Sequence, residues 1–325
     1  MEIRIYIYPI FFFGWYFMIL VEHLNKSYGE LHAVDGISFE VAEGELFGFL
    51  GPNGAGKTTT LSMISGLLKP DGGRVLINDI DVWQTPKTAK RILGLVPQDI
   101  ALYEELTGRE NLRFWGGLYS LSSKELKSNM DKWLDRVGLT DRANDAVSKY
   151  SGGMKRRLNL AVGMIHDPKI VLLDEPTVGI DPQARNNIME IIREIAREGT
   201  TLLFTTHHLE EVEDLCHRIA IMDHGKILQI GTVAELAQVV GDGDLVNIHG
   251  TFSPAAFKTA LSGLPLNFLN IAEGSATISM RQNGCNIAVL IQKMSEAGLA
   301  IDDLSMQKPS LESVFLKLTG RELRD

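Results

Sequence analysis

The stretch Gly51-Pro52-Asn53-Gly54-Ala55-Gly56-Lys57-Thr58 decides the fold of this chain. It follows an apolar run, Leu46–Leu50, that is typical of a strand, and it precedes a helical pattern that starts at Lys57. Glycines in such a loop let successive backbone N–H groups point inward and hold phosphate oxygens. We expect Lys57 to reach the β- and γ-phosphates and the Thr58 hydroxyl to hold Mg²⁺. A plain glycine turn is the alternative, but the spacing favours a site for a nucleoside triphosphate.

The composition is that of an ordinary globular protein. The chain has 325 residues, enough for two domains, with 45% apolar and 22% charged residues. Its net charge of −9 argues against a general nucleic-acid binder, which would present a basic face. The two cysteines, Cys216 and Cys285, lie far apart without metal-ligand spacing. They are most simply buried or inert thiols in a reducing compartment.

The N-terminal segment needs separate treatment because residues 5–21 are uncharged and rich in aromatic side chains. The run is short for a membrane span, a proline and a glycine interrupt it, and no signal-peptide cleavage site follows. We favour a non-native or misassigned extension over residues 1–17, with the functional start at Met18. A membrane-surface anchor and a true span remain as alternatives. A span reaching Val21 would consume the strand that the pattern Met18–Leu24 predicts.

Strand-like runs alternate with helical patterns over residues 18–235, which is typical of a mostly parallel sheet covered by helices. Between about residues 99 and 150 the strands stop. There Thr107 opens one helix with a capping-box pattern, and Lys124–Val137 forms another. The sequence therefore predicts a helical subdomain inserted into a nucleotide-binding α/β domain. The predicted strands of that domain are Leu46–Leu50, Val75–Asn78, Ile92–Val96, Ile170–Leu173, Thr201–Thr205 and Ile219–Met222, with a hairpin turn at Asp223–Lys226.

Residues 236–325 carry no phosphate motif and are predicted to form an accessory α+β domain. A helix around Val233–Val239 leads to a glycine-rich linker at Gly241–Asp244. The order βαββαβ that follows suggests a ferredoxin-like fold, and a last helix is expected from Leu311 to Leu318. The elements are a strand (Leu245–Ile248), a helix (Pro254–Leu261), two strands (Leu266–Ala272, Ala276–Met280), a helix (Asn286–Ala297) and a strand (Ala300–Gln307).

Two further motifs fit a triphosphate site. Asp174 and Glu175 end a buried strand, at the edge where parallel sheets bind ligands. Asp174 is placed to hold Mg²⁺, and Glu175 could polarise the attacking water as a general base. An acidic pair is usually a polar strand end, but the phosphate loop upstream favours the catalytic interpretation. In Ser151-Gly152-Gly153, the serine can cap a helix whose uncovered N–H groups bind an anion. The following Lys155–Arg157 could equally be a solvated face.

In this order the motifs resemble those of the ATP-binding cassette (ABC) ATPases, over about residues 18–235. Gly51–Thr58 is similar to their Walker A loop, Ile170–Glu175 to their Walker B strand, and Ser151–Gly153 to the core of their signature motif. Val178–Asp181 resembles their D-loop, and His207 resembles their switch histidine, for which His208 competes. The resemblance implies that Glu175 and His207 are catalytic and that Thr58, Gln98 and Asp174 hold Mg²⁺. The residues implied to bind ATP are Tyr28, Gly51, Pro52, Asn53, Gly54, Ala55, Gly56, Lys57, Thr58, Thr59, Gln98, Ser151, Gly152, Gly153 and Asp181.

The signature motif departs from the family consensus Leu-Ser-Gly-Gly-Gln, because Tyr150 and Met154 flank its core. The phosphate-contacting Ser-Gly-Gly is kept. Similar variants occur in the branch that drives multidrug, antibiotic, sodium or polymer exporters, and the segments 94–112 and 309–320 resemble that branch as well.

The family resemblance also implies partners. Two cassettes face each other head to tail, so Ser151 and Gly153 would act on the nucleotide of a second cassette, in a homodimer or beside a related chain. Export would require a separate transmembrane permease docked on the helical insert, with this chain peripheral at the cytoplasmic face of the membrane. The cargo is not disclosed, and no nucleic-acid partner is expected.

Other classes of function explain fewer residues. A soluble cassette protein acting on ribosomes or DNA would usually carry two fused cassettes or a long coiled-coil insert. A small-molecule kinase or GTPase would leave Ser151–Gly153 unexplained. An inactive binding module is disfavoured because Lys57, Asp174, Glu175 and His207 are all present.

Overall fold

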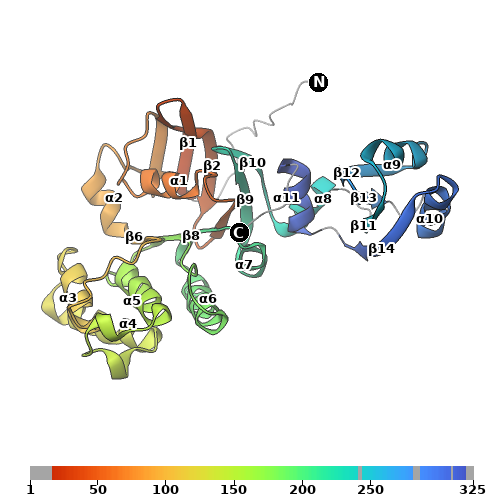
Figure 1. Ribbon diagram of the computed structural model, residues 1–325. Helices are drawn as coiled ribbons and strands as arrows, with labels where there is room; N and C mark the ends of the chain where they lie inside the picture. Colours follow the sequence, from red (N-terminus) through yellow and green to blue (C-terminus); the bar gives the residue numbers. More distant parts are fainter. Residues whose placement is uncertain (1–16, 241–243, 281–285, 309, 320–325) are drawn as a thin grey trace.

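The computed structural model describes residues 17–240, 244–280, 286–308 and 310–319. The sequence-based interpretations of residues 1–16, of Gly241–Gly243 in the linker and of Cys285 therefore lie outside the described residues. Figure 1 follows the chain from an antiparallel sheet at the N-terminus, through a mixed sheet and its helices, to a separate C-terminal sheet.

The N-terminal sheet is antiparallel and has the order β2-β1-β4-β5. Its strands are β1 (Phe17–Tyr28), β2 (Leu31–Ala42), β4 (Gly72–Ile77) and β5 (Ile80–Asp81). Ile19 and Val21 of β1 are buried and pair with Ile77 and Val75 of β4. Residues 17–21 therefore belong to this sheet and not to a membrane segment. Among the described residues, none of the helices has the length and apolar character needed to cross a membrane.

The central sheet has six strands in the order β10-β9-β3-β8-β7-β6. Its members are β3 (Leu46–Leu50), β6 (Leu93–Val96), β7 (Ile170–Asp174), β8 (Thr201–Thr206), β9 (Arg218–Asp223) and β10 (Lys226–Gly231). The strands from β9 to β6 run parallel, and β10 adds an antiparallel edge. Every residue of β3, β7 and β8 is buried, which explains the apolar residues at the centre of each strand.

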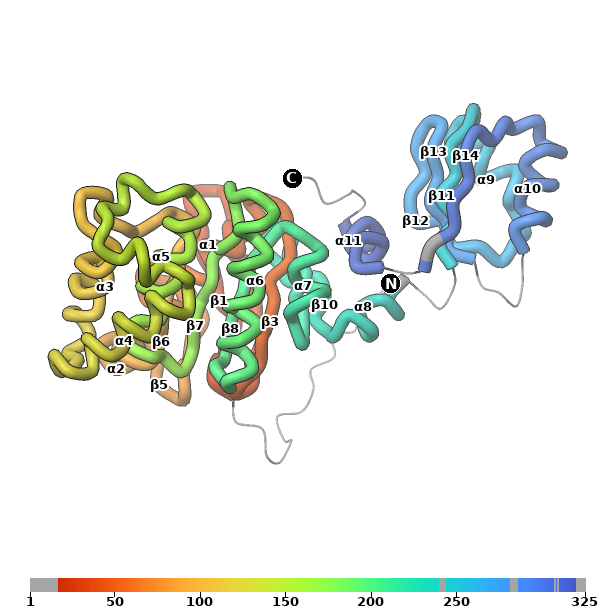
Figure 2. Tube along the Cα trace, turned by 90° about the horizontal axis from the view of Figure 1, so that it is seen from below, coloured from red at the N-terminus to blue at the C-terminus, as the bar shows by residue number. Residues whose placement is uncertain are grey.

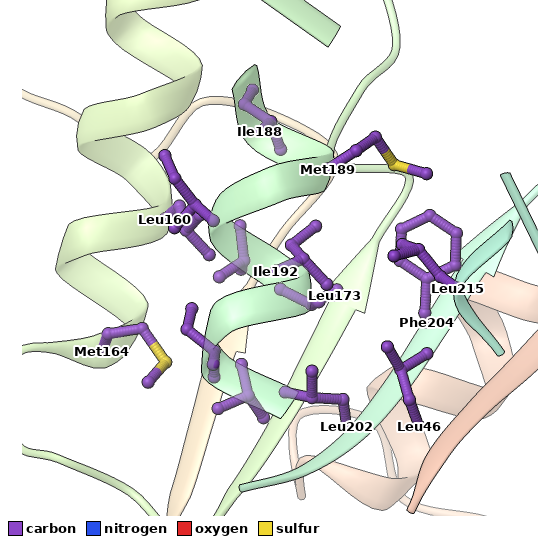
Figure 3. Packing of buried hydrophobic residues seen from close by; sticks show 14 of the residues in the cluster. Leu46, Leu160, Met164, Leu173, Ile188, Met189, Ile192, Leu202, Phe204 and Leu215 are labelled. Atoms are coloured by element: carbon purple, nitrogen blue, oxygen red, sulfur yellow. The ribbon is translucent and has the colours of Figure 1, made fainter. Parts of the chain in front are cut away.

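Helices cover this sheet and complete its core. They are α1 (Lys57–Ile64), α2 (Pro86–Ile92), α5 (Gly152–Met164), α6 (Pro182–Arg197) and α7 (Leu209–Leu215). Leu160 of α5 and Ile192 of α6 pack with Leu173, Leu202 and Phe204 from the strands, as Figure 3 shows. This packing fixes the start of α5 relative to the carboxyl ends of the strands.

The predicted helical subdomain lies between β6 and α5. It consists of α3 (Gly108–Gly117), α4 (Ser123–Arg136) and short 3-10 turns at Thr140–Arg142 and Val147–Lys149. Thr107 and Glu110 form the predicted capping box, with a Glu110 N to Thr107 Oγ1 distance of 3.1 Å.

Lys155, Arg156 and Arg157 do not form a simple solvated face. Lys155 pairs with Glu104, Arg156 donates to the carbonyl of Gln98, and Arg157 donates to the carbonyl of Val137. All three side chains therefore tie α5 to the segments around it.

The C-terminal sheet has the antiparallel order β12-β13-β11-β14. Its elements, β11 (Asp244–Thr251), α9 (Pro254–Ala260), β12 (Leu266–Ala272), β13 (Ser275–Met280), α10 (Ile287–Glu296) and β14 (Ala300–Gln307), follow the expected order βαββαβ. A core of its own includes Phe257, Ile278 and Leu290.

Two helices join this sheet to the rest of the molecule, α8 (Val233–Val240) on entry and α11 (Leu311–Thr319) on return. Both views place α11 between the C-terminal sheet and the cassette (Figures 1 and 2). Leu311 and Phe315 belong to the same apolar cluster as Val212 of α7 and Leu236 of α8. The backbone N–H of Leu311 also donates to Oε1 of Glu213 at 3.2 Å.

Candidate nucleotide site

The phosphate loop connects β3 to α1 at the carboxyl edge of the central sheet. Gly56 has φ of 103°, and a Cβ at this position would lie 2.4 Å from the carbonyl oxygen of Ala33, so only glycine fits. Within the described part of the chain, α1 has no side-chain cap at its N-terminus. Its first N–H groups are therefore left for an anion, whose negative charge the helix dipole favours.

Lys57 is folded back over this loop. Its side chain is 4% exposed, and Nζ donates to the carbonyls of Gly51 at 2.6 Å and Pro52 at 3.1 Å. Nζ also lies 3.2 Å from Oε1 of Glu175. Burial lowers the pKa of Lys57, and the negative charge of Glu175 opposes that shift. Without phosphate, these carbonyls and this carboxylate are the groups that pair with the lysine.

Asp174, at the end of β7, faces the start of α1. Its Oδ1 accepts from Thr58 Oγ1 at 3.2 Å and from Thr205 Oγ1 at 2.7 Å. Burial raises the pKa of Asp174, and the two hydroxyl donors oppose that shift. The described residues contain no cluster of three or more His, Cys, Asp or Glu side chains able to hold a metal. One carboxylate and one hydroxyl instead fit Mg²⁺, which takes oxygen ligands and completes its shell with substrate phosphate and water.

Glu175 lies at the centre of the polar contacts. It has φ of 43°, and its N–H donates to the carbonyl of Thr205 at 3.2 Å and to Thr205 Oγ1 at 3.0 Å. Its Oε2 accepts from Gln98 Nε2 at 3.3 Å. Nδ1 of His207 lies 3.3 Å from the same oxygen, but without the alignment of a hydrogen bond. Three segments far apart in sequence, the phosphate loop, Gln98 and the end of β8, thus converge on two adjacent acidic residues.

The two histidines after β8 have different surroundings. His207 faces Glu175, whereas His208 stands at the start of α7, where its N–H donates to Thr206 Oγ1 at 3.0 Å. The geometry therefore supports His207 over His208 as the histidine of this site.

A pocket of about 390 Å³ opens beside the loop. Tyr28 is one of its lining residues and is 52% exposed. Four lining residues were not predicted, Leu31, His32, Ala33 and His224. The complete lining consists of Tyr28, Leu31, His32, Ala33, Asn53, Gly54, Ala55, Gly56, Lys57, Thr58, Thr59, Gln98, Glu175 and His224.

The remaining predicted residues lie on another surface. Ser151 caps α5 by accepting from the N–H of Met154 at 3.3 Å, and Asp181 caps α6 by accepting from the N–H of Ala184 at 2.9 Å. These two helix starts touch, because a Cβ on Gly153 would lie 2.7 Å from Cβ of Ala184. Ser151, Gly152 and Asp181 are exposed. The structure thus brings Lys57, Thr58, Gln98, Asp174, Glu175 and His207 together and leaves Ser151–Gly153 and Asp181 outside that group.

A glycine loop between a parallel strand and a helix, with an acidic strand end beside it, defines a P-loop nucleoside triphosphatase. Residues 34–178 match the family described as ABC transporter. The chain is 42% identical over 311 residues to the linearmycin resistance ATP-binding protein of Bacillus subtilis, covering 95% of this chain and 100% of that protein. It is 39% identical to Nod factor export ATP-binding protein I of Paraburkholderia xenovorans, and the match covers 94% of this chain and 97% of that protein. It is 37% identical to a daunorubicin resistance ATP-binding protein of Streptomyces coeruleorubidus, again covering 94% and 97%.

Solved structures agree with this match. An ATP-binding subunit of an ABC transporter is 30% identical and superposes with a TM-score of 0.64, covering 69% of this chain and 93% of that one. A dimeric ATP-binding cassette bound to ADP and Pi is 26% identical, with a TM-score of 0.61, covering 66% and 98%.

The chain belongs to the ATP-binding cassette family. It is an ATP-binding and ATP-hydrolysing subunit of an ABC transporter, which confirms the resemblance carried by its motifs and the expected fold of its cassette. The comparisons give no support to a cassette protein acting on ribosomes or DNA.

Proposed function

We propose that this protein drives export through a separate membrane permease, using ATP to close two cassettes on each other. The observation that carries the proposal is the separation of its site into two surfaces. Lys57 and Glu175 line one pocket, with His207 beside Glu175, whereas Ser151 and Gly152 are exposed at the start of α5, on another surface. Similar proteins named for linearmycin resistance, daunorubicin resistance and Nod factor export support the direction of transport.

The contacts indicate how the residues of one cassette would respond to ATP. Phosphate oxygens would replace the carbonyls of Gly51 and Pro52 as partners of Lys57, which releases Oε1 of Glu175. Glu175 would then take the proton of the attacking water, oriented by Gln98 and His207. Thr58, Asp174 and Gln98 are the residues that would hold Mg²⁺, which supplies neutralisation of phosphate charge.

The second cassette would supply the Ser151–Gly153 segment, which lies outside this pocket. The N–H groups at the start of the partner's α5 would meet the terminal phosphate, so that one ATP joins two chains. We propose a homodimer with two such sites. The Glu175→Gln protein should therefore form dimers with ATP and remain monomeric without it, measured by light scattering, and a Glu175→Gln protein that stays monomeric with saturating ATP would refute the proposal.

A mixing experiment tests whether the sites are shared. The variants Lys57→Ala and Ser151→Ala should each be nearly inactive alone. In a mixed dimer, both changes fall in one site and the other site keeps an intact Lys57 and an intact Ser151. Mixing should restore ATP hydrolysis, whereas sites built within one chain would give no recovery.

The permease would dock where the helical subdomain meets the central sheet. A groove of about 290 Å³ there is lined largely by apolar side chains, including Leu95, Pro97 and Trp115. Nε1 of Trp115 is buried and has no hydrogen-bond partner among the described residues. Tyr103 and Phe114, both 44% exposed, pack against each other with ring centroids 4.8 Å apart. Exposed aromatic side chains around an apolar groove are typical of protein interaction surfaces.

This docking surface can be tested with the closed form of the protein. Glu175→Gln protein with Mg-ATP should recover a polytopic membrane protein from native membranes, identified by mass spectrometry. Adding Phe114→Glu should abolish that recovery. The matched control is Val289→Glu, which places the same charge on an exposed apolar position of α10. Recovery of soluble partners alone would remove the permease from the proposal. With a permease bound, the protein would lie peripherally at the cytoplasmic face of the membrane.

A further inference from the structure

Glu211 is a buried carboxylate of α7 that lies behind the nucleotide site. It is 3% exposed and belongs to none of the phosphate motifs. Its Oε1 accepts from Thr177 Oγ1 at 2.7 Å, and its Oε2 accepts from Thr206 Oγ1 at 2.5 Å. Nε of Arg185 lies 3.6 Å from Oε1. A carboxylate at this depth requires such partners, because an unpaired buried charge is strongly unfavourable.

The partners of Glu211 belong to two loops with different proposed roles. Thr206 directly precedes His207, and its hydroxyl also accepts from the N–H of His208 at 3.0 Å. Thr177 directly precedes the segment Val178–Asp181, and Arg185 lies in the first turn of the helix that Asp181 caps. One carboxylate therefore holds the start of the histidine loop and both ends of the Val178–Asp181 segment.

These two loops face different sides of the proposed dimer. His207 lies beside Glu175 at the nucleotide site of its own chain, while Asp181 caps α6, whose first turn packs against Gly153 on the surface proposed to meet the second cassette. Their parent strands β7 and β8 are hydrogen-bonded neighbours, but that ladder ends at the pair of Asp174 and Thr205. Beyond those residues, the contacts of Glu211 fix the positions of the two loops relative to each other. Glu211 itself borders a different pocket, together with Arg185 and Asp214.

We propose that Glu211 is a positioning residue for ATP hydrolysis, which fixes the loop of His207 against the loop of Asp181. This inference rests on the proposed roles of those two loops. Its consequence is specific: loss of the carboxylate should slow the chemical step and leave nucleotide binding in the pocket unchanged. A residue that only stabilised the core would alter the unfolding transition without this separation.

The test uses Glu211→Gln in the full chain. Glutamine keeps the shape but has an NH2 group in place of one acceptor oxygen, so one of the two hydroxyls, which donate to different oxygens of Glu211, loses its acceptor. We expect kcat for ATP hydrolysis to fall at least about tenfold, since small displacements of catalytic groups have effects of this order or larger. The Kd of a fluorescent ATP analogue should stay within about twofold of the wild-type value, because none of the contacts of Glu211 reaches the pocket lining. The matched control is Glu210→Gln, which removes an exposed carboxylate one residue earlier in the same helix.

Two isosteric variants test the same contacts in case the Glu211→Gln protein does not fold. Thr206→Val and Thr177→Val each delete one of the hydroxyl donors, and each should lower kcat with the Kd preserved. Combining Thr206→Val with Glu211→Gln should cost less than the product of the single effects, because both changes break the same contact.

Wild-type kcat in folded Glu211→Gln, or in both threonine variants, would overturn the inference. So would a loss of nucleotide binding that matches the loss of kcat. If Glu211→Gln lowers kcat but the Lys57→Ala and Ser151→Ala mixture shows no recovery, the proposed shared sites fail and the positioning role stands.

Discussion

The buried pair of Lys57 and Glu175 allows a quantitative prediction for the nucleotide-free protein. The two side chains are 4% and 5% exposed and 3.2 Å apart. Breaking a buried ion pair by removing one partner typically costs about 3–5 kcal/mol, because the other charge is left uncompensated. Here each survivor keeps partners, since Lys57 retains two carbonyls and Glu175 retains Gln98. We therefore expect Lys57→Met and Glu175→Gln each to lower the free energy of unfolding by about 2 kcal/mol.

The double variant distinguishes the energy of the ion pair from the other effects of each single substitution. If the ion pair is responsible, Lys57→Met with Glu175→Gln should cost at least about 1 kcal/mol less than the sum of the single changes. Urea unfolding without nucleotide, followed by tryptophan fluorescence, measures this directly, because the described tryptophans, Trp83, Trp115 and Trp133, all belong to the cassette. Additive costs, or a Lys57→Met protein more stable than the wild type, would refute the reasoning.

Three further predictions concern packing and pH. Tyr150→Phe should lower stability by about 1 kcal/mol in urea unfolding, because the hydroxyl that donates to the carbonyl of Arg142 at 2.7 Å is lost; an unchanged midpoint would contradict this. Gly94→Ala should cost about 1–3 kcal/mol, since its Cβ would lie 2.4 Å from a carbonyl oxygen of α5, whereas Gly117→Ala, with open space around it at the end of α3, is the control that should not destabilise. Burial lowers the pKa of His166 from 6.5 to about 4, so its neutral form stabilises the folded state. That contribution is complete above pH 6.5 and is lost as the pH falls toward 4, and an NMR titration placing the pKa of His166 near 6.5 would exclude it.

The sequence predicted those helices and strands whose characteristic pattern lies within a few adjacent residues. The capping box at Thr107 marked the start of α3 because the two groups that satisfy each other lie three residues apart. The buried strands β3, β7 and β8 were predicted within a residue, because burial on both faces gives each a short central run of apolar residues. Strand β2 was missed, since its polar and apolar residues alternate irregularly around Gly36.

The residues of the site also divide into those marked by a local motif and those whose partners lie far away in the sequence. The phosphate loop and the acidic strand end are contiguous motifs, so Lys57 and Glu175 could be named from their own residues, whereas Gln98 and His207 followed only from the family resemblance. Arg156 could not be assigned, because the carbonyl that it contacts belongs to Gln98, 58 positions earlier in the chain. The role of Glu211 was equally hidden, since its partner Thr177 lies 34 residues away and neither side chain belongs to a phosphate motif.

The return of α11 to the cassette has a consequence for the order of folding. Leu311, Val314 and Phe315 complete an apolar cluster whose other members are synthesised much earlier, such as Leu46 and Phe204. On the ribosome the whole C-terminal sheet emerges before this helix does. The cassette can build its sheets first, but the surface of α7 and α8 stays uncovered until residues 311–316 are free to dock. A nascent chain stalled before residue 311 should therefore expose an apolar patch that the finished protein hides, and that interval is when we expect chaperones to bind it.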